Sequence, residues 1–309
     1  MKLRSIKYVG ALCLMGWAAC LTIANTVEAG TGLKKIVLIA GAKSHGPGDH
    51  EYEKGAKLLK HCLDTSPNVK GVKTEVYLNG WPQNHAALED VDTILLYSDG
   101  SDRNEKAHPL LIGERMATLD RLMKRGVGFM AIHYAVFIPS KKCGDGYLDW
   151  MGGYFDYENG PAANKWFSKI ETKTYAVHPA APTHPIALGL KPFELKEEYY
   201  FNMRFREPDT RRVPILTFGP DDSDASSVVA WAVQRTDGGR GFGYTGGHFH
   251  KNWQNENVRK MVLNALLWTA KVEVPPGGVE STLPTDEQSK SEEAIKTLII
   301  TGHNPPAHN

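Results

Sequence analysis

Hydrophobic positions in the first half of the chain follow two alternating spacings. Short, continuous apolar runs bounded by glycine or polar residues predict strands that are buried on both faces. Stretches with an apolar residue every three or four positions predict amphipathic helices between them. The predicted strands are 34–40, 72–78, 93–97 and 126–133, and the predicted helices are 52–63 and 112–125. Strands that alternate with helices indicate right-handed crossovers and a parallel sheet.

The second half of the chain is less regular. Between Pro139 and about Pro192, glycine, proline and aromatic residues are frequent and helical periodicity is weak. This texture indicates an insertion or a set of long loops, where substrate contacts are usually found. The pattern then predicts strands over 194–205, 213–218 and 228–234, an apolar run that ends at Gly246–Gly247, and a helix over 256–268. We therefore expect one α/β domain over residues 33–278.

The amino-terminal residues are typical of an export signal. Three basic residues precede a mostly apolar stretch, and small residues follow at the −3 and −1 positions of a cleavage site. This pattern predicts a signal peptide over 1–29 and export to the periplasm or the extracellular space. The apolar stretch is short for a membrane span. Anchoring as a lipoprotein at Cys20 is the less favoured alternative, because Trp17 is a poor lipobox residue.

The carboxyl-terminal residues differ from the predicted domain. Residues 279–293 are polar and charged, which indicates a linker. Residues 294–309 repeat the lysine, apolar run and glycine of 35–41, and we interpret them as the first strand of a truncated second copy of the domain. A plain carboxyl-terminal strand is the alternative. In either case we expect residues 279–309 to be poorly tied down.

Composition excludes several classes of function. The 309 residues carry 36 Lys and Arg against 35 Asp and Glu, and this net charge of +1 offers no basic excess for a phosphate backbone. The glycines of 238–243 precede a strand rather than open a helix, so they do not form a dinucleotide loop. Beyond the signal peptide, only Cys62 and Cys143 remain, and we expect two unpaired thiols. The sequence leaves homo-oligomerisation open.

Polar residues gather where the predicted strands end, and parallel strands place their carboxyl ends at one edge of the sheet. Imidazole and carboxylate groups suit a divalent first-row ion, with Zn²⁺ favoured; otherwise no cofactor is expected. The predicted metal ligands are His45, His50 and His248. The predicted catalytic residues are His133, His250 and Glu198, with Glu197 as an alternative to Glu198. The predicted substrate-binding residues are Asp99, Trp150, Trp166, Tyr200 and Trp253.

Each of these residues also has a purely structural interpretation. The two loop histidines, His45 and His50, could be solvated, and His133 could be a core histidine bonded to backbone. Asp99 before a glycine could form an Asx turn. The aromatic side chains are as typical of packing as of platforms for a sugar ring.

Seven segments together resemble the trehalose-utilisation (ThuA-like) family. They are residues 41–51, 77–82, 97–100, 133–136, 149–155, 200–205 and 246–253. The resemblance covers roughly residues 34–281. It implies the class I glutamine-amidotransferase-like fold, a flavodoxin-like three-layer α/β sandwich with a mostly parallel central sheet. It also implies a role in sugar catabolism, and relatives of known structure suggest metal binding.

The chain departs from true amidotransferases at two positions. The place of their nucleophilic cysteine matches His133, and the glutamate of their Phe-His-Pro-Glu run matches Asn252. Without a thiol no glutamyl thioester can form, so glutaminase chemistry is not expected.

Two functions remain in view. The first is an exported, metal-dependent enzyme that acts on a disaccharide or keto-sugar as an isomerase, epimerase or lyase. The second is a non-catalytic carbohydrate-binding module in a tandem-domain protein. Both take a small-molecule sugar as the partner, and neither involves nucleic acid or a membrane span.

Overall fold

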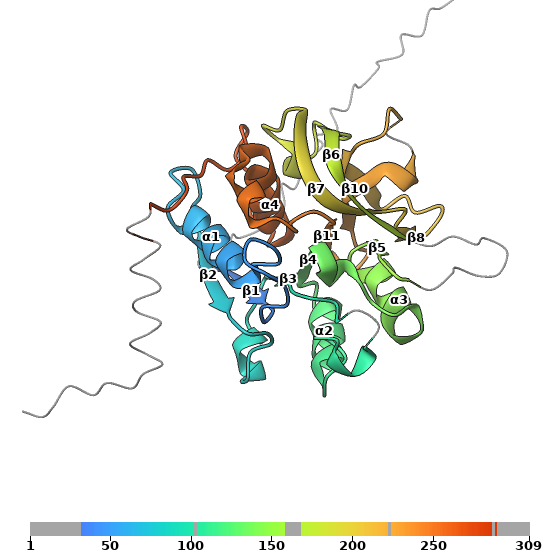
Figure 1. The fold of residues 1–309 in the computed structure, drawn as a ribbon. Coiled ribbons are helices and arrows are strands. Elements are labelled where there is room, and N and C mark those ends of the chain that lie inside the picture. The colour runs from blue at the N-terminus through green and yellow to red at the C-terminus, as the bar shows by residue number, and fades with distance from the viewer. Residues whose placement is uncertain (1–31, 102–103, 158–167, 222–223, 286–287, 289–309) are drawn as a thin grey trace, which may run out of the picture. The chain divides into compact units, whose positions relative to one another are not determined.

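The structure is a computed structural model in which residues 32–101, 104–157, 168–221, 224–285 and 288 are described (Figure 1). The expected signal peptide over 1–29 with Cys20, the expected repeat over 294–309 and Trp166 lie outside the described residues. Within the expected linker over 279–293, residues 286–287 and 289–293 also lie outside them. No helix in the described part of the chain is long and apolar enough to cross a membrane.

Five parallel strands form one half of a nine-stranded sheet. They are β1 (Lys34–Ala40), β2 (Val72–Tyr77), β3 (Thr93–Tyr97), β4 (Gly128–Ile132) and β11 (Arg240–Tyr244), in the spatial order β2-β1-β3-β4-β11. Each neighbouring pair among them is parallel. The strands β3 and β4 are buried at every position, as their continuous apolar runs predict. The predicted strands of the first half are thus confirmed to within three residues at each end.

Helices cover both faces of this half of the sheet. They are α1 (Tyr52–Asp64), α2 (Arg115–Lys124), α3 (Ser140–Trp150) and α4 (Glu256–Thr269). On one face, α1 and α4 pack against Ile36 and Leu38; on the other, α2 and α3 share a core with Val37 and Ile39. Alternate residues of β1 therefore enter two different cores, as the period of a strand requires. Helix, sheet and helix make the expected three-layer α/β sandwich (Figure 1).

The other half of the sheet is antiparallel. From β11 the order continues through β10 (Val228–Gln234), β9 (Arg212–Thr217), β6 (Lys169–Pro179) and β7 (Phe193–Phe201). Each strand runs against its neighbour. The sequence pattern predicts a mostly parallel sheet, and this description holds for the centre only. The pairs β6–β7, β9–β10 and β10–β11 join strands that follow one another through connections without a crossover helix, so they are hairpins, whereas β6 and β9 are paired although β7 lies between them in the chain.

The segment from Pro139 to Pro192 contains more regular structure than expected. It begins with α3, whose backbone leaves helical geometry at Cys143, and it includes the long strand β6. Helical periodicity is weak because Gly144 and Gly146 fall inside α3. Cys143 therefore lies at a kink between two helical segments of α3. It and Cys62 are both free thiols, as predicted.

Smaller elements complete the domain. A second sheet pairs β5 (Gly153–Tyr154) with β8 (Arg204–Phe205). The described residues also form the short 3-10 helices η1 (His85–Leu88), η2 (Glu105–Ala107), η3 (His133–Val136), η4 (Pro185–Ala187), η5 (Ala225–Ser227) and η6 (His250–Gln254).

The strand β7 stands last in the sheet order but reaches back to its middle. The β6–β7 hairpin pairs residue for residue from Lys169 with Phe201 to Val177 with Phe193. Its tyrosine Tyr199 lies with its ring centroid 6.2 Å from that of Tyr244 on β11. The hairpin thus folds over the carboxyl end of the central strands, where Figure 1 shows β7 crossing β10.

The described residues after 278 pack against the domain. Val279 is fully buried, and its N–H donates to Oδ1 of Asn264 over 2.8 Å. The N–H of Glu280 donates to Oδ1 of Asn68 over 3.0 Å. The stretch expected to be loosely attached from residue 279 therefore begins with residues held by α4 and by the loop after α1.

We predict that replacing Asn264 with leucine lowers the free energy of unfolding by about 3 kcal/mol, because buried polar groups would lose their partners. The amide of Asn264 also donates to the carbonyls of Ile186 and Leu188, so three backbone groups depend on it. Urea denaturation gives the free energy. The control Gln254→Leu, at an exposed position before α4, should change it by less than about 0.5 kcal/mol. Equal stability of both variants would contradict the role given to Asn264.

Candidate metal centre

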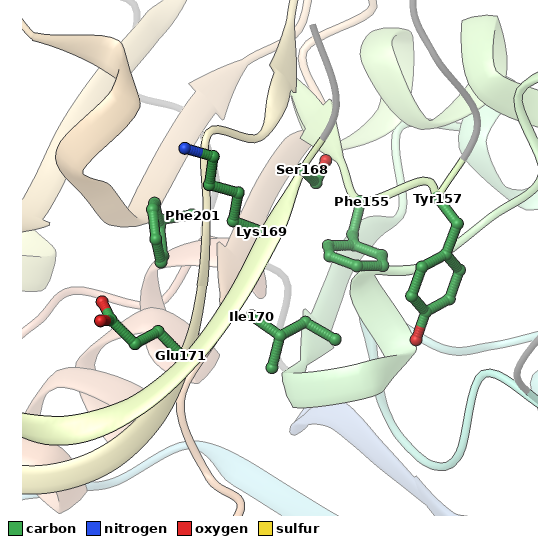
Figure 2. A pocket seen from close by; sticks show the side chains of 7 residues that line it. All are labelled: Phe155, Tyr157, Ser168, Lys169, Ile170, Glu171 and Phe201. Atoms are coloured by element: carbon green, nitrogen blue, oxygen red, sulfur yellow. The ribbon is translucent and has the colours of Figure 1, made fainter.

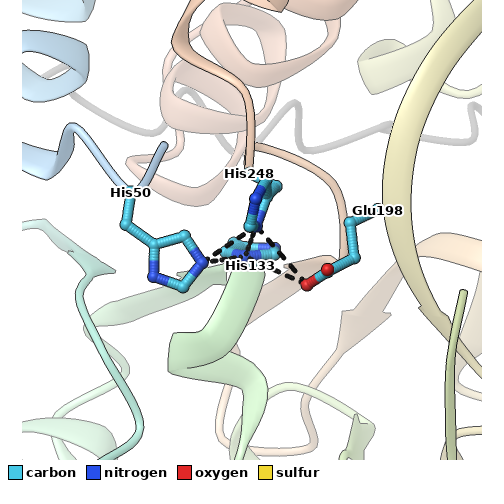
Figure 3. Close-up of side chains that lie close together, drawn as sticks. All are labelled: His50, His133, Glu198 and His248. Carbon is cyan, nitrogen blue, oxygen red and sulfur yellow. Dashed lines mark hydrogen bonds and ion pairs between the residues drawn. The ribbon is translucent and has the colours of Figure 1, made fainter. Parts of the chain in front are cut away.

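Three imidazoles and one carboxylate meet at the carboxyl edge of the central strands (Figure 3). They belong to His50, His133, His248 and Glu198, and one ligand atom of each lies within 4.8 Å of the others. Nε2 of His133 is 2.9 Å from Nε2 of His50 and 3.3 Å from Nδ1 of His248. Nε2 of His50 is 3.0 Å from Nδ1 of His248. Oε1 of Glu198 is 3.4 Å from that Nδ1 and 3.9 Å from Nε2 of His133.

Hydrogen bonds cannot satisfy all three ring nitrogens at once. A ring nitrogen either carries a proton and donates or carries a lone pair and accepts. Among three mutually close nitrogens, at least one pair must therefore set two donors or two acceptors against each other. Nδ1 of His133 lies 3.0 Å from the carbonyl oxygen of Thr245, which can only accept, so the lone pair of neutral His133 is on Nε2 and faces the cluster.

This arrangement fits a bound metal ion. Zinc holds histidine nitrogens at about 2.0–2.1 Å in tetrahedral geometry, which places neighbouring ligand atoms about 3.4 Å apart. The observed separations lie close to this spacing. The carbonyl of Thr245 fixes the tautomer of His133 in the way that outer partners orient metal-bound histidines. Three imidazoles beside one carboxylate favour zinc or another first-row ion over Mg²⁺ or Ca²⁺.

Unusual backbone conformations orient the side chains of two of the histidines. His50 and His133 have φ angles of 49° and 55°, in the left-handed region that residues other than glycine rarely occupy. His133 starts η3 directly after β4, so the chain turns sharply at the end of a buried strand. Gly247, with φ 110°, gives a similar turn before His248. Strained positions of this kind cluster at functional sites.

Two loops distant in sequence are joined next to the cluster. The N–H of His50 donates to the carbonyl of His248 over 3.0 Å, and the N–H of His250 donates to the carbonyl of Gly48 over 2.8 Å. Between these bonds, Asp49 and Phe249 form an isolated antiparallel bridge. The loop after β1 and the loop after β11 therefore hold each other in place.

The buried carboxylate of Glu197 holds the loop that carries His248 through hydrogen bonds to its backbone. Its Oε1 accepts hydrogen bonds from the N–H groups of Glu198 and His248, and its Oε2 accepts from the N–H of Gly247 and from Nδ2 of Asn252. Burial raises the pKa of Glu197, and the hydrogen bonds from Asn252, Gly247 and Glu198 and the charge of His248 oppose the shift. From the sequence alone, Glu197 and Glu198 are alternatives for one catalytic role. They have different roles because successive residues of a strand face opposite sides.

Electrostatics distinguishes the members of the cluster. Burial lowers the pKa of His133 to about 3, and the nearby imidazole of His50 adds to the shift. Burial also acts to lower the pKa of His248, but the hydrogen bond and charge of Glu198 outweigh it and raise that pKa. The same contact, with the charge of His133, lowers the pKa of Glu198 to about 2 despite burial. Glu198 is therefore ionised at neutral pH.

A second group of side chains lies on the outer side of His50. Nδ1 of His50 is 2.6 Å from the hydroxyl of Tyr52, 3.2 Å from Oγ of Ser44 and 3.8 Å from Oδ2 of Asp99. His45 is exposed, with its ring centroid 3.6 Å from that of His50, and ligand atoms of His45, His50 and Asp99 lie within 4.8 Å of one another. Burial acts to raise the pKa of Asp99, but hydrogen bonds from His50 and Ser44 lower it to about 2.

The remaining candidate residues are spread more widely. The hydroxyl of Tyr200 lies 3.3 Å from Nε2 of His133, next to the cluster. His250 begins η6 outside the cluster, where burial and then the charge of Lys54 lower its pKa. Trp150 is buried in a core with Phe129, and Trp253 is buried next to Tyr97. The structure thus brings His50, His133, His248, Glu198 and Tyr200 together, and places His250 and the two tryptophans elsewhere.

The roles of two positioning residues are not evident from the sequence. The sequence presents Tyr52 only as the first residue of a predicted helix, and Glu197 only as an alternative to its neighbour. A tyrosine two positions after a loop histidine, and paired acids inside an apolar strand, were the available signals.

Comparison with known proteins places the chain in a family. Residues 37–269 match the ThuA family, described as trehalose utilisation. The chain belongs to this family. No curated protein matches it. The family resemblance expected from the sequence is thereby confirmed.

Solved structures of ThuA-like proteins share the fold. One from Parabacteroides merdae is 17% identical with a TM-score of 0.53, and covers 82% of this chain and 94% of its own. One from Bacteroides uniformis is 12% identical with a TM-score of 0.53, and covers 77% and 91%. A glutamine amidotransferase from Thermotoga maritima is 10% identical with a TM-score of 0.44, and covers 77% and 98%. The fold, a sheet that is parallel at its centre and has helices on both faces, is the expected flavodoxin-like α/β sandwich and is shared with the two ThuA-like structures.

We predict that Glu197→Gln lowers the free energy of unfolding by about 2–3 kcal/mol, because an amide NH₂ would replace an oxygen that accepts two hydrogen bonds. Urea denaturation measures the effect. Glu194→Gln makes the same change at an exposed position of β7 and should stay within about 0.5 kcal/mol of the parent. If the two variants are equally stable, Glu197 does not hold the loop.

The low pKa of His133 predicts a loss of stability in acid. An unfolded histidine takes up a proton near pH 6.5, whereas folded His133 stays neutral down to about pH 3. The unfolded chain therefore binds more protons in this window, and stability falls as the pH falls.

In the presence of a chelator, His133 should lower the free energy of unfolding by about 2 kcal/mol as the pH falls from 6.5 to 5. Urea denaturation of the parent and of His133→Gln across this range isolates the contribution, since the carboxylates with low pKa stay ionised. Over this pH range, the free energy of unfolding of His133→Gln should fall by about 2 kcal/mol less than that of the parent. Parallel curves would mean that His133 is not held neutral.

Proposed function

We propose that this ThuA-family protein is a metal-dependent enzyme of carbohydrate catabolism that acts on a disaccharide or keto-sugar. The single observation that supports a metal is the convergence of the ring nitrogens of His50, His133 and His248 within 3.3 Å of one another. The sugar substrate rests on the family, which is described as trehalose utilisation. Export is part of the proposal and rests only on the sequence of residues 1–29.

Each side chain has a separate role in this proposal. His50, His133 and His248 hold the ion, and Zn²⁺ suits this donor set best. When bound, the ion supplies Lewis acidity at a sugar carbonyl or hydroxyl. The carboxylate of Glu198 is ionised and lies next to two of the ligand nitrogens, so it accepts a proton from the substrate. The hydroxyl of Tyr200 lies on the same side and orients a sugar oxygen.

The supporting contacts favour transfer of a proton next to a carbonyl. The tyrosine hydroxyl of Tyr52 and the carboxylate of Asp99 hold His50 from outside, and Glu197 holds the loop of His248. Catalytic groups fixed in this way need no rearrangement during the reaction. Isomerisation, epimerisation or elimination beside a keto group all need one base and one polarising group, which this set provides.

A carbohydrate-binding module without turnover is the second candidate. It is favoured by the repeat of the 35–41 pattern near the end of the chain, which is typical of tandem domains. The first candidate is preferred because sugar binding alone gives no reason for a buried group of three imidazoles.

We predict about one equivalent of zinc, manganese or nickel in the protein purified without a chelator or histidine tag. His248→Gln should lower this content at least tenfold, because it removes one ligand. His250→Gln is the matched control, since it changes the same residue type two positions away and outside the cluster. His45→Gln should also keep the ion if the inner group holds it. Elemental mass spectrometry measures the content.

Two outcomes would contradict the proposal. Absence of metal in the parent, or equal loss from His248→Gln and His250→Gln, would exclude this centre. If the metal is present, Glu198→Gln should abolish turnover of keto-disaccharides. A parent that binds sugars but turns none over would favour the binding module.

A further inference from the structure

The inner group of metal-ligand candidates is closed off on the side of β6. Its members are His50, His133, Glu198 and His248. A cavity beside the first residues of β6 has Phe155 and Ile170 in its wall (Figure 2). The buried ring of Phe155 has its centroid 4.9 Å from that of Tyr200, which is buried too and lies 4.8 Å from the ring of His133. These two rings separate the cavity from the inner group, so a metal ion needs another way in.

The loop after β1 offers that way, because it is open to solvent. Every residue from 42 to 48 is exposed, and His45 lies among them. Close to it, the side chains of Asp99 and His50 are 24% and 3% exposed. These three residues form the outer group. Burial therefore increases in steps from the surface to His50, the residue that the inner and outer groups share.

The outer group has the ligands to hold a metal ion itself. Its ligand atoms lie within 4.8 Å of one another, and Oδ2 of Asp99 is 3.8 Å from Nδ1 of His50. The backbone N–H of Ser101 donates to Oδ1 of Asp99 and so holds this carboxylate in place. Two imidazoles and one carboxylate suit Zn²⁺ or another first-row ion, and water completes the coordination on the exposed side.

The two groups cannot use His50 at the same time. A neutral imidazole has one lone pair, which lies on Nε2 for the inner group or on Nδ1 for the outer group. An ion at the inner group leaves the proton on Nδ1, which then donates a hydrogen bond to the hydroxyl of Tyr52, 2.6 Å away. An ion at the outer group leaves the proton on Nε2, which then donates to Nε2 of His133, 2.9 Å away. Each arrangement satisfies His50, and each excludes the other.

The inner group should bind the ion more tightly than the outer group. It has four ligand groups against three, and the carbonyl of Thr245 and the carboxylate of Glu197 hold two of its histidines in place. The outer group includes His45, which is exposed and loses conformational entropy when it binds. An ion there also replaces the hydrogen bond between His50 and Tyr52. An ion that arrives at the surface therefore gains free energy by moving inward.

We propose that the outer group is a second, weaker metal-ion site, which captures the ion at the surface and passes it to the inner group. In the transfer, the bond between the ion and Nδ1 of His50 breaks and a bond to Nε2 forms. Nε2 gives up its proton to water, and Nδ1 takes one from water. The proposal rests on the metal centre of the proposed function, but not on the sugar or on the reaction.

Equilibrium dialysis of the metal-free protein against zinc tests the second site. The parent should bind one ion, even with zinc in about tenfold excess, because the two groups exclude each other. His248→Gln removes an inner ligand and should raise the Kd at least about tenfold. In this background, adding His45→Gln should raise the Kd about tenfold again, whereas in the parent it should leave the Kd within about twofold. His61→Gln, the same change on α1, is the matched control and should alter neither Kd.

The rate of zinc uptake tests the transfer. Stopped-flow mixing of the metal-free protein with zinc and a fluorescent zinc indicator gives this rate. His45→Gln should slow uptake at least about tenfold, although the protein still ends with one ion, because capture is lost while the inner group is intact. His61→Gln should leave the rate unchanged.

These measurements separate the proposal from the proposed function. A parent that binds no zinc would overturn both. A parent that binds one ion would overturn the outer site alone if His45→Gln fails to weaken binding in the His248→Gln background or fails to slow uptake. Two ions in the parent, with the second lost in His45→Gln, would show that the groups do not exclude each other and would overturn the transfer.

Discussion

The site depends on one constraint, which is that three ring nitrogens within 3.3 Å cannot all hydrogen bond to one another. A fold tolerates such a conflict only if the surrounding structure overrides it. Three features do this here. The carboxylate of Glu197 accepts four hydrogen bonds, and the backbone of two histidines is left-handed. A bridge between Asp49 and Phe249 also joins the two loops that carry His50 and His248. Each of these features would be costly in a protein that had no use for the cluster, because each orders groups or buries charge.

Local patterns were sufficient for the parallel half of the fold. Runs such as 34–40 and 93–97 are apolar on both faces, and only a strand covered on two sides explains that. The antiparallel half could not be inferred in the same way. The first six residues of β6 are exposed on both faces, so they show no clean alternation of apolar and polar positions. These residues pair with β7 in the β6–β7 hairpin. The position of that hairpin depends on contacts between residues distant in sequence, such as that of Tyr199 with Tyr244.

Most members of the histidine cluster could be predicted from the positions where strands end. His50, His133 and His248 all follow strands whose carboxyl ends lie at the same edge of the sheet. The sequence could not separate His248 from His250, because residues two positions apart would share one face of a continuing strand, whereas β11 ends at Tyr244. The chain turns at Gly247 instead, and the following bridge sends His250 away from the cluster. Nor does sequence distinguish a tryptophan on a surface from one in a core, and Trp150 belongs to the core.

The contact between His50 and His248 joins residues 198 positions apart. Closing a loop of that length costs conformational entropy, so the contact forms only once the intervening chain is ordered. On the ribosome, His50 emerges long before its partner and must wait for nearly the whole domain to be synthesised. The histidine cluster is therefore a late product of folding. A nascent chain that stalls before His248 already carries the first four strands, but it cannot assemble the centre.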